Sequence, residues 1–171
     1  NYSNDNLPLF GISDHIFKTF DDRPNLLTKR EVRVQILADL ELPKNGVIWD
    51  IGAGCGSIGL EALKLRPNLD LFCIDKRFGS KALILENSER LGVKPKFICE
   101  EDINNILNTK NLSPFEKPNR LVIGGCDKKT KLQIINSLDQ WMSIGDIIVI
   151  PIIDIQTIKE LKEELEDKNF K

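Results

Sequence analysis

Residues 47–59 read Val47-Ile48-Trp49-Asp50-Ile51-Gly52-Ala53-Gly54-Cys55-Gly56-Ser57-Ile58-Gly59. An apolar run ends in the carboxylate of Asp50, and glycines then alternate at 52, 54 and 56 before a helical pattern begins. Glycine permits backbone conformations and close approaches that a Cβ atom forbids, and the start of a helix presents oriented N–H donors. The segment therefore predicts a buried strand, a turn that approaches a ligand, and a helix.

From residue 47 onward, short β-branched runs alternate with amphipathic helical stretches. This alternation predicts an α/β fold of the Rossmann-like type, with a mostly parallel sheet and helices on both faces. Gly92 stands where a glycine would end a helix. We expect strands at 47–50, 71–75, 96–99, 121–123 and 147–150, and helices at 57–65, 81–91, 131–138 and 155–167.

The residues before the first strand predict one further helix. Thr28 and Glu31 are spaced as in a capping box, in which each side chain satisfies a free backbone donor at a helix start. Apolar residues then recur every four positions from Val32 to Leu40. Farther along, a proline-containing stretch at 108–119 predicts a loop.

The composition is typical of one soluble globular domain. The chain has 171 residues, 41% hydrophobic and 29% charged, with a formal net charge of -2. That length suits a single core, and the charge gives no general attraction to the phosphate backbone of nucleic acids. No apolar run approaches the roughly 20 residues that span a bilayer. We expect a cytoplasmic protein that binds neither nucleic acid nor membrane.

The cysteines and the single histidine give no reason to expect a metal centre or disulfides. The four cysteines stand far apart and form no Cys-x-x-Cys pair. Cys126 follows a double glycine after the fourth predicted strand, where ligands bind in open α/β sheets. Because no basic partner for its thiol is visible, we expect it to make contacts rather than act as a nucleophile.

Acidic residues follow the second and third predicted strands. Asp75 ends the second strand, where a carboxylate accepts hydrogen bonds from both hydroxyls of a ribose. Asp102 follows the third strand, near the place of an adenine ring in such sites. With the glycine turn, these acids predict a ligand that contains a nucleoside.

Two cofactors fit this pattern. Gly54, Gly56 and Gly59 also form the G-x-G-x-x-G of dinucleotide-binding proteins. Asp50, however, would repel a pyrophosphate, whereas S-adenosylmethionine has no phosphate and carries a sulfonium and an ammonium. The acid favours S-adenosylmethionine, and a dinucleotide and a turn without ligand remain as alternatives.

Four segments of the chain share their residues with one enzyme family. They are Gly11-Ile12-Ser13-Asp14 with Phe17, Leu27-Thr28-Lys29-Arg30-Glu31-Val32-Arg33, Trp49-Asp50-Ile51-Gly52-Ala53-Gly54-Cys55-Gly56-Ser57, and Ile123-Gly124-Gly125. Together they resemble the decarboxylating precorrin methyltransferases of cobalamin biosynthesis, which are class I S-adenosylmethionine-dependent enzymes. Many methyltransferases share the glycine motif, whereas the threonine–lysine segment and the double glycine are more particular to this family.

The resemblance implies an activity and the residues that carry it. The reaction is methylation of carbon 15 of precorrin-6Y or cobalt-precorrin-6B, with loss of carbon dioxide from the ring C acetate, in a homotetramer. Residues 1–171 would form a single methyltransferase domain, with 1–45 over the cofactor site and 46–171 as a core that lacks the last strands. Together with the residue pattern, it implies cofactor contacts from Thr28, Asp50, Gly52, Gly54, Gly56, Ser57, Asp75, Lys76, Asp102 and Gly124, and tetrapyrrole contacts from Gly125, Cys126 and Lys128.

Methyl transfer to an electron-rich carbon chiefly requires that the reacting atoms be held close and aligned. The sequence accordingly singles out no catalytic base, and we expect no metal. Basic residues are candidates to pair with the many carboxylates of a tetrapyrrole, or are plain surface charges. They are Arg23, Lys29, Arg33, Lys128 and Lys129.

The chain departs from the family at the substrate end of the sheet. Cys126-Asp127-Lys128-Lys129 stand where family members usually have serine and further glycines, and Pro151 follows the fifth strand where a small or polar residue is usual. These departures keep open a methyltransferase of another small molecule, RNA or protein, and a silent cofactor-binding subunit. A nicotinamide-dependent oxidoreductase is the alternative that follows from the dinucleotide motif.

Overall fold

A computed structural model describes residues 7–24, 26–108 and 114–167. Within these ranges the sheet has five strands in the order β3-β2-β1-β4-β5, and every neighbouring pair is parallel. The predicted Rossmann-like α/β fold and each predicted strand are confirmed. The strands are β1 (Gly46–Ile51), β2 (Leu69–Ile74), β3 (Phe97–Cys99), β4 (Arg120–Ile123) and β5 (Ile147–Val149).

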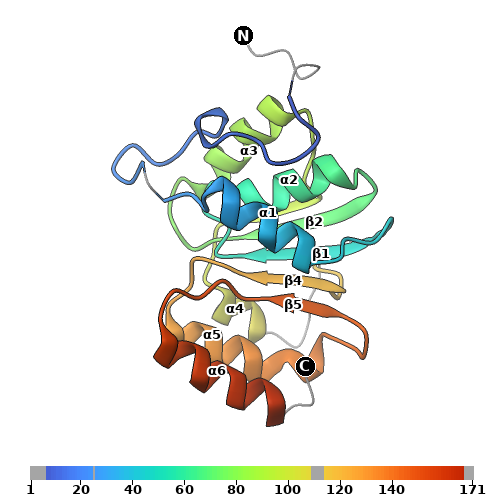
Figure 1. Ribbon diagram of the computed structural model, residues 1–171, viewed down its shortest axis with the longest axis vertical. Helices are drawn as coiled ribbons and strands as arrows, with labels where there is room; N and C mark the ends of the chain where they lie inside the picture. Colours follow the sequence, from blue (N-terminus) through green and yellow to red (C-terminus); the bar gives the residue numbers. More distant parts are fainter. Residues whose placement is uncertain (1–6, 25, 109–113, 168–171) are drawn as a thin grey trace.

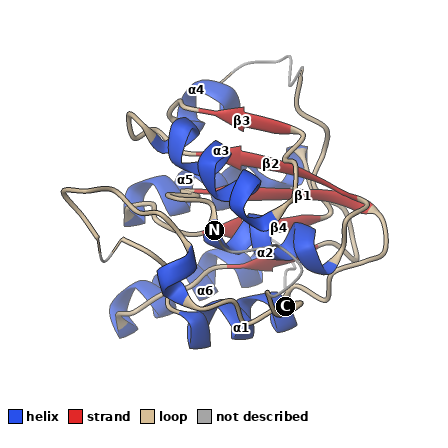
Figure 2. Cartoon of the chain, turned by 90° about the horizontal axis from the view of Figure 1, so that it is seen from above, coloured by secondary structure: helices blue, strands red, loops and turns tan. Residues whose placement is uncertain are grey.

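Helices cover both faces of the sheet (Figures 1 and 2). The chain returns across the sheet after each strand, as parallel pairing requires. No helix among the described residues has both the length and the apolar character needed to cross a bilayer. One face carries α1 (Arg30–Asp39), α2 (Ser57–Leu65) and α3 (Ser80–Leu91). The other face carries α4 (Ile103–Leu107), α5 (Lys128–Ser137) and α6 (Ile155–Asp167). The chain also forms two short 3-10 turns, η2 (Asp14–Ile16) and η3 (Leu138–Gln140).

The sheet divides the apolar core into two clusters because successive strand residues point to opposite faces. In β1, Ile48 packs in the cluster beneath α1–α3, whereas Trp49 packs in the cluster beneath α4–α6. Trp49 is fully buried, and its ring lies 5.5 Å from both Trp141 and Phe115, centroid to centroid. The tryptophan therefore packs against the sheet rather than facing the ligand edge.

Several helix ends differ from the sequence prediction, and local capping explains them. α5 begins earlier than expected because the carboxylate of Asp127 accepts the Thr130 N–H at 2.8 Å. α4 was not predicted, since five residues are too few to show a period, and Asp102 caps it. Gly92 ends α3 in the left-handed conformation (φ 66°), as expected. Residues 109–113 of the predicted loop lie outside the described residues.

The predicted capping box at the start of α1 is wrong. The N-cap residue is Lys29, and it makes no side-chain cap hydrogen bond. Thr28 contributes its backbone instead, because its carbonyl accepts a hydrogen bond from Nη1 of Arg33 at 2.6 Å. The Glu31 side chain is exposed and lies 3.9 Å from Arg30.

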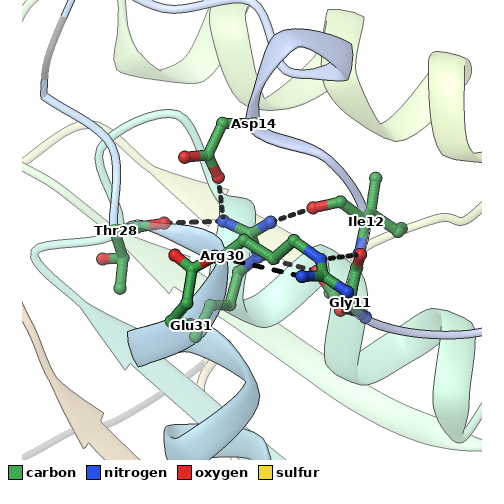
Figure 3. Close-up of polar contacts among 8 residues, drawn as sticks. Gly11, Ile12, Asp14, Thr28, Arg30 and Glu31 are labelled. Atoms are coloured by element: carbon green, nitrogen blue, oxygen red, sulfur yellow. Dashed lines mark hydrogen bonds and ion pairs between the residues drawn. The ribbon is translucent and has the colours of Figure 1, made fainter.

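Arg33 is the centre of a buried polar cluster that joins the N-terminal segment to α2. Figure 3 shows Gly11, Ile12, Asp14 and Thr28 of this cluster. The Arg33 guanidinium has no solvent exposure and donates to Glu61 at 2.7 Å, to Asp14 at 3.2 Å and to the carbonyls of Thr28 and Ile12. Four of the five N–H groups of Arg33 are thus donated within the protein, and the side chain has no contact with solvent. In this arrangement Arg33 is not presented to a substrate carboxylate.

Glu61 completes this cluster from α2. It is also fully buried, and its second carboxylate oxygen accepts the N–H groups of Gly11 and Ile12. A buried ion pair is stable only when further hydrogen bonds satisfy both partners, which is the case here. The pair thus fixes residues 11–14 and residue 28 against the core.

Replacing Arg33 by methionine should destabilise the fold by about 3–5 kcal/mol, because Glu61 would stay buried without a counter-ion. Urea denaturation followed by tryptophan fluorescence measures the free energy of unfolding. The double variant Arg33→Met/Glu61→Gln should lose less than the sum of the two single variants, since it leaves no lone buried charge. Arg30→Met, at a side chain 52% exposed, is the matched control and should cost about 1 kcal/mol or less. Equal losses for the two arginine variants would contradict the role of the pair.

Candidate functional site

A cavity of about 360 Å³ lies at the carboxyl ends of the strands. This is the edge at which ligands bind in open α/β sheets. Its wall includes residues from the ends of β1 and β2, from the loops that follow the strands, from the first turns of α4 and α5, and from the N-terminal segment. They are Arg23, Leu26, Ile51, Gly52, Ile74, Asp75, Lys76, Arg77, Glu101, Asp102, Ile103, Gly125, Cys126, Asp127 and Thr130.

The glycine turn after β1 passes close to the loop after β4. Gly52 has φ +73°, and a Cβ atom on it would lie 2.6 Å from the backbone nitrogen of Gly125. Gly125 instead donates its N–H to the Gly52 carbonyl at 3.2 Å. Gly56 then enters α2 in the left-handed conformation, with φ 80°. Both glycines are therefore required by the backbone, as the sequence motif indicated.

Asp75 holds the turn to the end of β2. Its side chain is 2% exposed, and its Oδ2 accepts the Gly54 N–H at 2.7 Å. Its Oδ1 accepts the backbone N–H of Arg77 at 2.9 Å. The Arg77 guanidinium donates to both oxygens, and this hydrogen bonding raises the pKa of the arginine. The carboxylate is thus held in one orientation at the cavity wall.

Asp50 lies beneath the turn and not on the cavity wall. It is 1% exposed, and its Oδ2 accepts the Gly59 N–H at 3.0 Å. Its Oδ1 is the only buried side-chain nitrogen or oxygen among the described residues that has no hydrogen-bond partner. Burial raises the pKa of Asp50 to about 7, repulsion from Asp75 adds to the rise, and the Gly59 N–H opposes it.

Asp102 marks the far side of the cavity, beyond β3. Its carboxylate caps α4 by accepting the Asn104 N–H at 3.0 Å, and Lys76 lies 3.3 Å from it. The backbone hydrogen bond from Asn104 and the nearby Lys76 lower the pKa of Asp102 despite partial burial. Asp102 therefore contributes a fixed negative charge opposite the glycine turn.

Cys126 lies on the cavity wall next to the double glycine. Burial, with repulsion from Asp75, raises the pKa of its thiol to about 11. A thiol with that pKa stays protonated near neutral pH and is a poor nucleophile. Among the described residues, no group of three or more His, Cys, Asp or Glu side chains is arranged to hold a metal ion.

The structure brings together only part of the predicted site. Gly52, Asp75, Lys76, Asp102, Gly125 and Cys126 all line the cavity. Several other predicted residues do not line it. Four of them belong to the glycine turn or to the strand and helix beside it, namely Asp50, Gly54, Gly56 and Ser57. The backbone N–H of Gly124 donates to the Ile51 carbonyl, and the Thr28 carbonyl accepts a hydrogen bond from Arg33. Lys128 forms an ion pair with Glu160 of α6.

Sequence reasoning missed Arg77, which follows the strand-end acid by two residues. That spacing lets the arginine fold back onto Asp75, and the acid itself was the available signal. Arg23, a candidate from its charge alone, does lie on the cavity wall. The remaining wall residues, which were not among the predicted contacts, are Leu26, Ile51, Ile74, Glu101, Ile103, Asp127 and Thr130.

Known proteins resemble this chain over most of its length. A curated relative from Saccharolobus solfataricus, named probable cobalt-precorrin-6B C(15)-methyltransferase (decarboxylating), is 32% identical over 167 residues, which span 94% of this chain and 78% of the relative. The crystal structure of precorrin-6y C5,15-methyltransferase from Geobacter metallireducens has a TM-score of 0.79 at 30% identity and covers 94% of this chain and 81% of that one. The structure of a precorrin 8w decarboxylase from Methanobacterium thermoautotrophicum has a TM-score of 0.78 at 25% identity and covers 94% and 82%.

The family model of the precorrin methyltransferase domain matches residues 18–167. That range contains the sheet, its six helices and the complete cavity wall. The chain belongs to the precorrin methyltransferase family.

Proposed function

We propose that this chain is an S-adenosylmethionine-dependent methyltransferase that methylates carbon 15 of a precorrin or cobalt-precorrin and decarboxylates the ring C acetate. One observation carries the proposal: the family match at 18–167 includes every residue of the cavity wall, from Arg23 to Thr130. The named relatives support the same reaction. By resemblance to the family, we further propose one methyltransferase domain that acts as a homotetramer in the cytoplasm.

The residues present fit S-adenosylmethionine. Asp75 offers two carboxylate oxygens to the two hydroxyls of a ribose, at the end of β2. Gly52 presents only backbone atoms to the cavity wall. Asp50 places an unpaired carboxylate oxygen beneath that turn, which favours a ligand with a positive charge. Further contacts are proposed from Thr28, Gly54, Gly56, Ser57, Lys76, Asp102 and Gly124.

A dinucleotide fits the same residues poorly. Its pyrophosphate would approach the glycine turn with two negative charges. Asp50 lies buried directly beneath this turn and Asp75 beside it, in a medium where charges interact more strongly than in water. The cationic ligand is therefore the better match, which argues against a nicotinamide-dependent oxidoreductase.

When bound, the cofactor supplies an electrophilic methyl group. The chain's own residues orient the reactants and exclude water, which are the main requirements of such a transfer. Leu26, Ile51, Ile74 and Ile103 make much of the cavity wall apolar. Cys126, held protonated by its raised pKa, does not compete for the methyl group.

The substrate end of the cavity lies beside the loop after β4. We propose that Gly125, Cys126 and Lys128 contact the tetrapyrrole there. The departure from the usual family sequence at 126–129 is located at this end, and it leaves the ribose site at Asp75 unchanged. We therefore expect any functional difference between this chain and its relatives to lie in the substrate rather than in the cofactor.

The first test measures cofactor binding. Asp75→Asn should weaken binding of S-adenosylhomocysteine by at least about tenfold, because the amide loses the negative charge and one acceptor for the ribose hydroxyls. Isothermal titration calorimetry gives the Kd. Asp70→Asn, at an exposed acid on the opposite end of the same strand, is the matched control and should bind like the unmodified protein. Failure of the unmodified protein to bind would refute the cofactor assignment.

The second test uses the pKa of Asp50, about 7 in the folded protein against 3.8 ordinarily. The folded state binds the proton of the Asp50 carboxyl more tightly than the unfolded state does. Protonated Asp50 therefore contributes stability that is complete below about pH 4 and is lost as the pH rises through 7. Asp50→Asn keeps an acceptor for Gly59 and removes the buried charge. The difference in free energy of unfolding between Asp50→Asn and the unmodified protein should therefore shift by roughly 2–3 kcal/mol in favour of the variant from pH 5 to pH 8. Urea titrations at both pH values measure this, and parallel profiles would contradict the assignment.

The third test measures the reaction itself. Incubation with S-adenosylmethionine and the reduced precorrin substrate should yield a product that has gained a methyl group and lost carbon dioxide, as detected by mass spectrometry. Asp75→Asn should give none at the same cofactor concentration. Cofactor binding with an unchanged tetrapyrrole would instead indicate a methyltransferase of another substrate or a silent subunit.

A further inference from the structure

Arg77 occupies both oxygens of the carboxylate proposed to bind the ribose. Its Nε donates to Oδ1 of Asp75 at 2.8 Å, and its Nη2 donates to Oδ2 at 2.5 Å. Two parallel N–H groups on one carboxylate form the strongest common type of side-chain ion pair. The Arg77 side chain remains 23% exposed, so it has a path toward solvent.

The guanidinium also lies across the cavity beside the glycine turn. Its Nη2 is 3.7 Å from the place of a Cβ on Gly54 and 3.1 Å from the place of a Cβ on Gly125. Phe20, from the N-terminal segment, has its ring centroid 5.8 Å from the guanidinium carbon. The arginine thus fills space between the glycine turn and the loop after β4, next to Asp75.

A ribose and this guanidinium would use the same two acceptor oxygens of Asp75. The two hydroxyls of a ribose and the two N–H groups of an arginine each present a pair of donors to the two oxygens of one carboxylate. Asp75 also accepts the N–H groups of Gly54 and Arg77, so little acceptor capacity is left over. Both ligands cannot hold the carboxylate in this way at once.

The other cations of the cavity wall are paired as well. Arg23 lies 3.5 Å from Asp22, and Lys76 lies 3.3 Å from Asp102. The wall cations are Arg23, Lys76 and Arg77, so each has an acidic partner. The side chains of Arg23 and Lys76 are more than half exposed, so both reach solvent without breaking their pairs, whereas the pair of Arg77 with Asp75 is nearly buried. Arg77 therefore becomes available to a substrate carboxylate only when this pair opens, and a ribose on Asp75 is the ligand that would open it.

We propose, on the basis of the proposed function, that Arg77 passes from Asp75 to a substrate carboxylate when the cofactor binds. In the pair that the structure shows, the arginine neutralises a nearly buried acid, whose negative charge would otherwise be costly. The ribose hydroxyls would displace the guanidinium as donors to both carboxylate oxygens. The freed arginine then serves as the carboxylate-binding group, so the cofactor binds before the substrate.

Arg77→Met tests this inference, because it keeps the aliphatic stem and removes the internal competitor. The Kd for S-adenosylhomocysteine, measured by calorimetry, should fall by roughly 5- to 20-fold. The KM for the precorrin substrate should rise by a similar factor. Arg66→Met, which removes one charge at the exposed end of α2, is the matched control and should change neither value. Arg77→Lys should lie between, since an ammonium lacks the paired donors.

A second measurement uses the unmodified protein. The side-chain Nε–H resonance of Arg77 in a ¹⁵N-labelled sample should shift and lose protection from exchange on titration with S-adenosylhomocysteine. An unchanged resonance, or an equal or weaker Kd in Arg77→Met, would refute the displacement. A tighter Kd with an unchanged KM would refute the transfer to the substrate. Absence of binding to the unmodified protein would refute the proposed function instead, so the two failures are distinct.

Discussion

Glu61 and Arg33 carry opposite charges at positions with no access to water, and taking both out of water costs several kcal/mol each. The structure recovers this cost because the pair is bonded to each other and to the backbone of the N-terminal segment. The chain before β1 therefore has one favourable place, against α2. Arg23 and Leu26 reach the cavity wall from that place. The shape of the ligand site thus depends on a contact that contributes no atom to it.

Buried charges are also found at the carboxyl ends of the strands, where the ligand cavity lies. Asp50 and Asp75 end adjacent strands, and both are almost fully buried. Asp75 has an arginine as counter-ion, whereas Asp50 has one backbone donor and a pKa raised to about 7. The side chains around these two acids therefore supply less positive charge than two buried carboxylates require. A ligand that brings positive charge relieves the imbalance, which is why we regard charge, more than shape, as the basis of cofactor choice.

The features that could be predicted from the sequence are those that depend on neighbours along the chain. The glycine turn, the acid at the end of β2 and the cap at Gly92 are set within a few residues, and all lie where expected. The buried pair of Arg33 and Glu61 was not predicted, because its members lie 28 positions apart and each resembles an ordinary charged residue of an amphipathic helix.

Thr28 shows the opposite error. Its spacing from Glu31 suggested a capping box, yet Arg33 engages its carbonyl from within the helix, and a long-range cluster overrides the local signal. Of the residues that the family resemblance named, Gly52, Asp75 and Gly125 lie on the cavity wall, whereas Thr28 does not.

Gly52 and Gly125 pass each other as bare backbone, joined by one hydrogen bond, with no room for even a methyl group between them. The seam between β1 and β4 is consequently the least compliant part of the cavity, since closely packed backbone cannot yield without disturbing the strands. The cavity wall also carries the long side chains of Lys76 and Arg77, and each is held by an ion pair, Lys76 to Asp102 and Arg77 to Asp75. The cavity therefore adapts to a larger ligand by opening these ion pairs, and no hinge in the sheet is required.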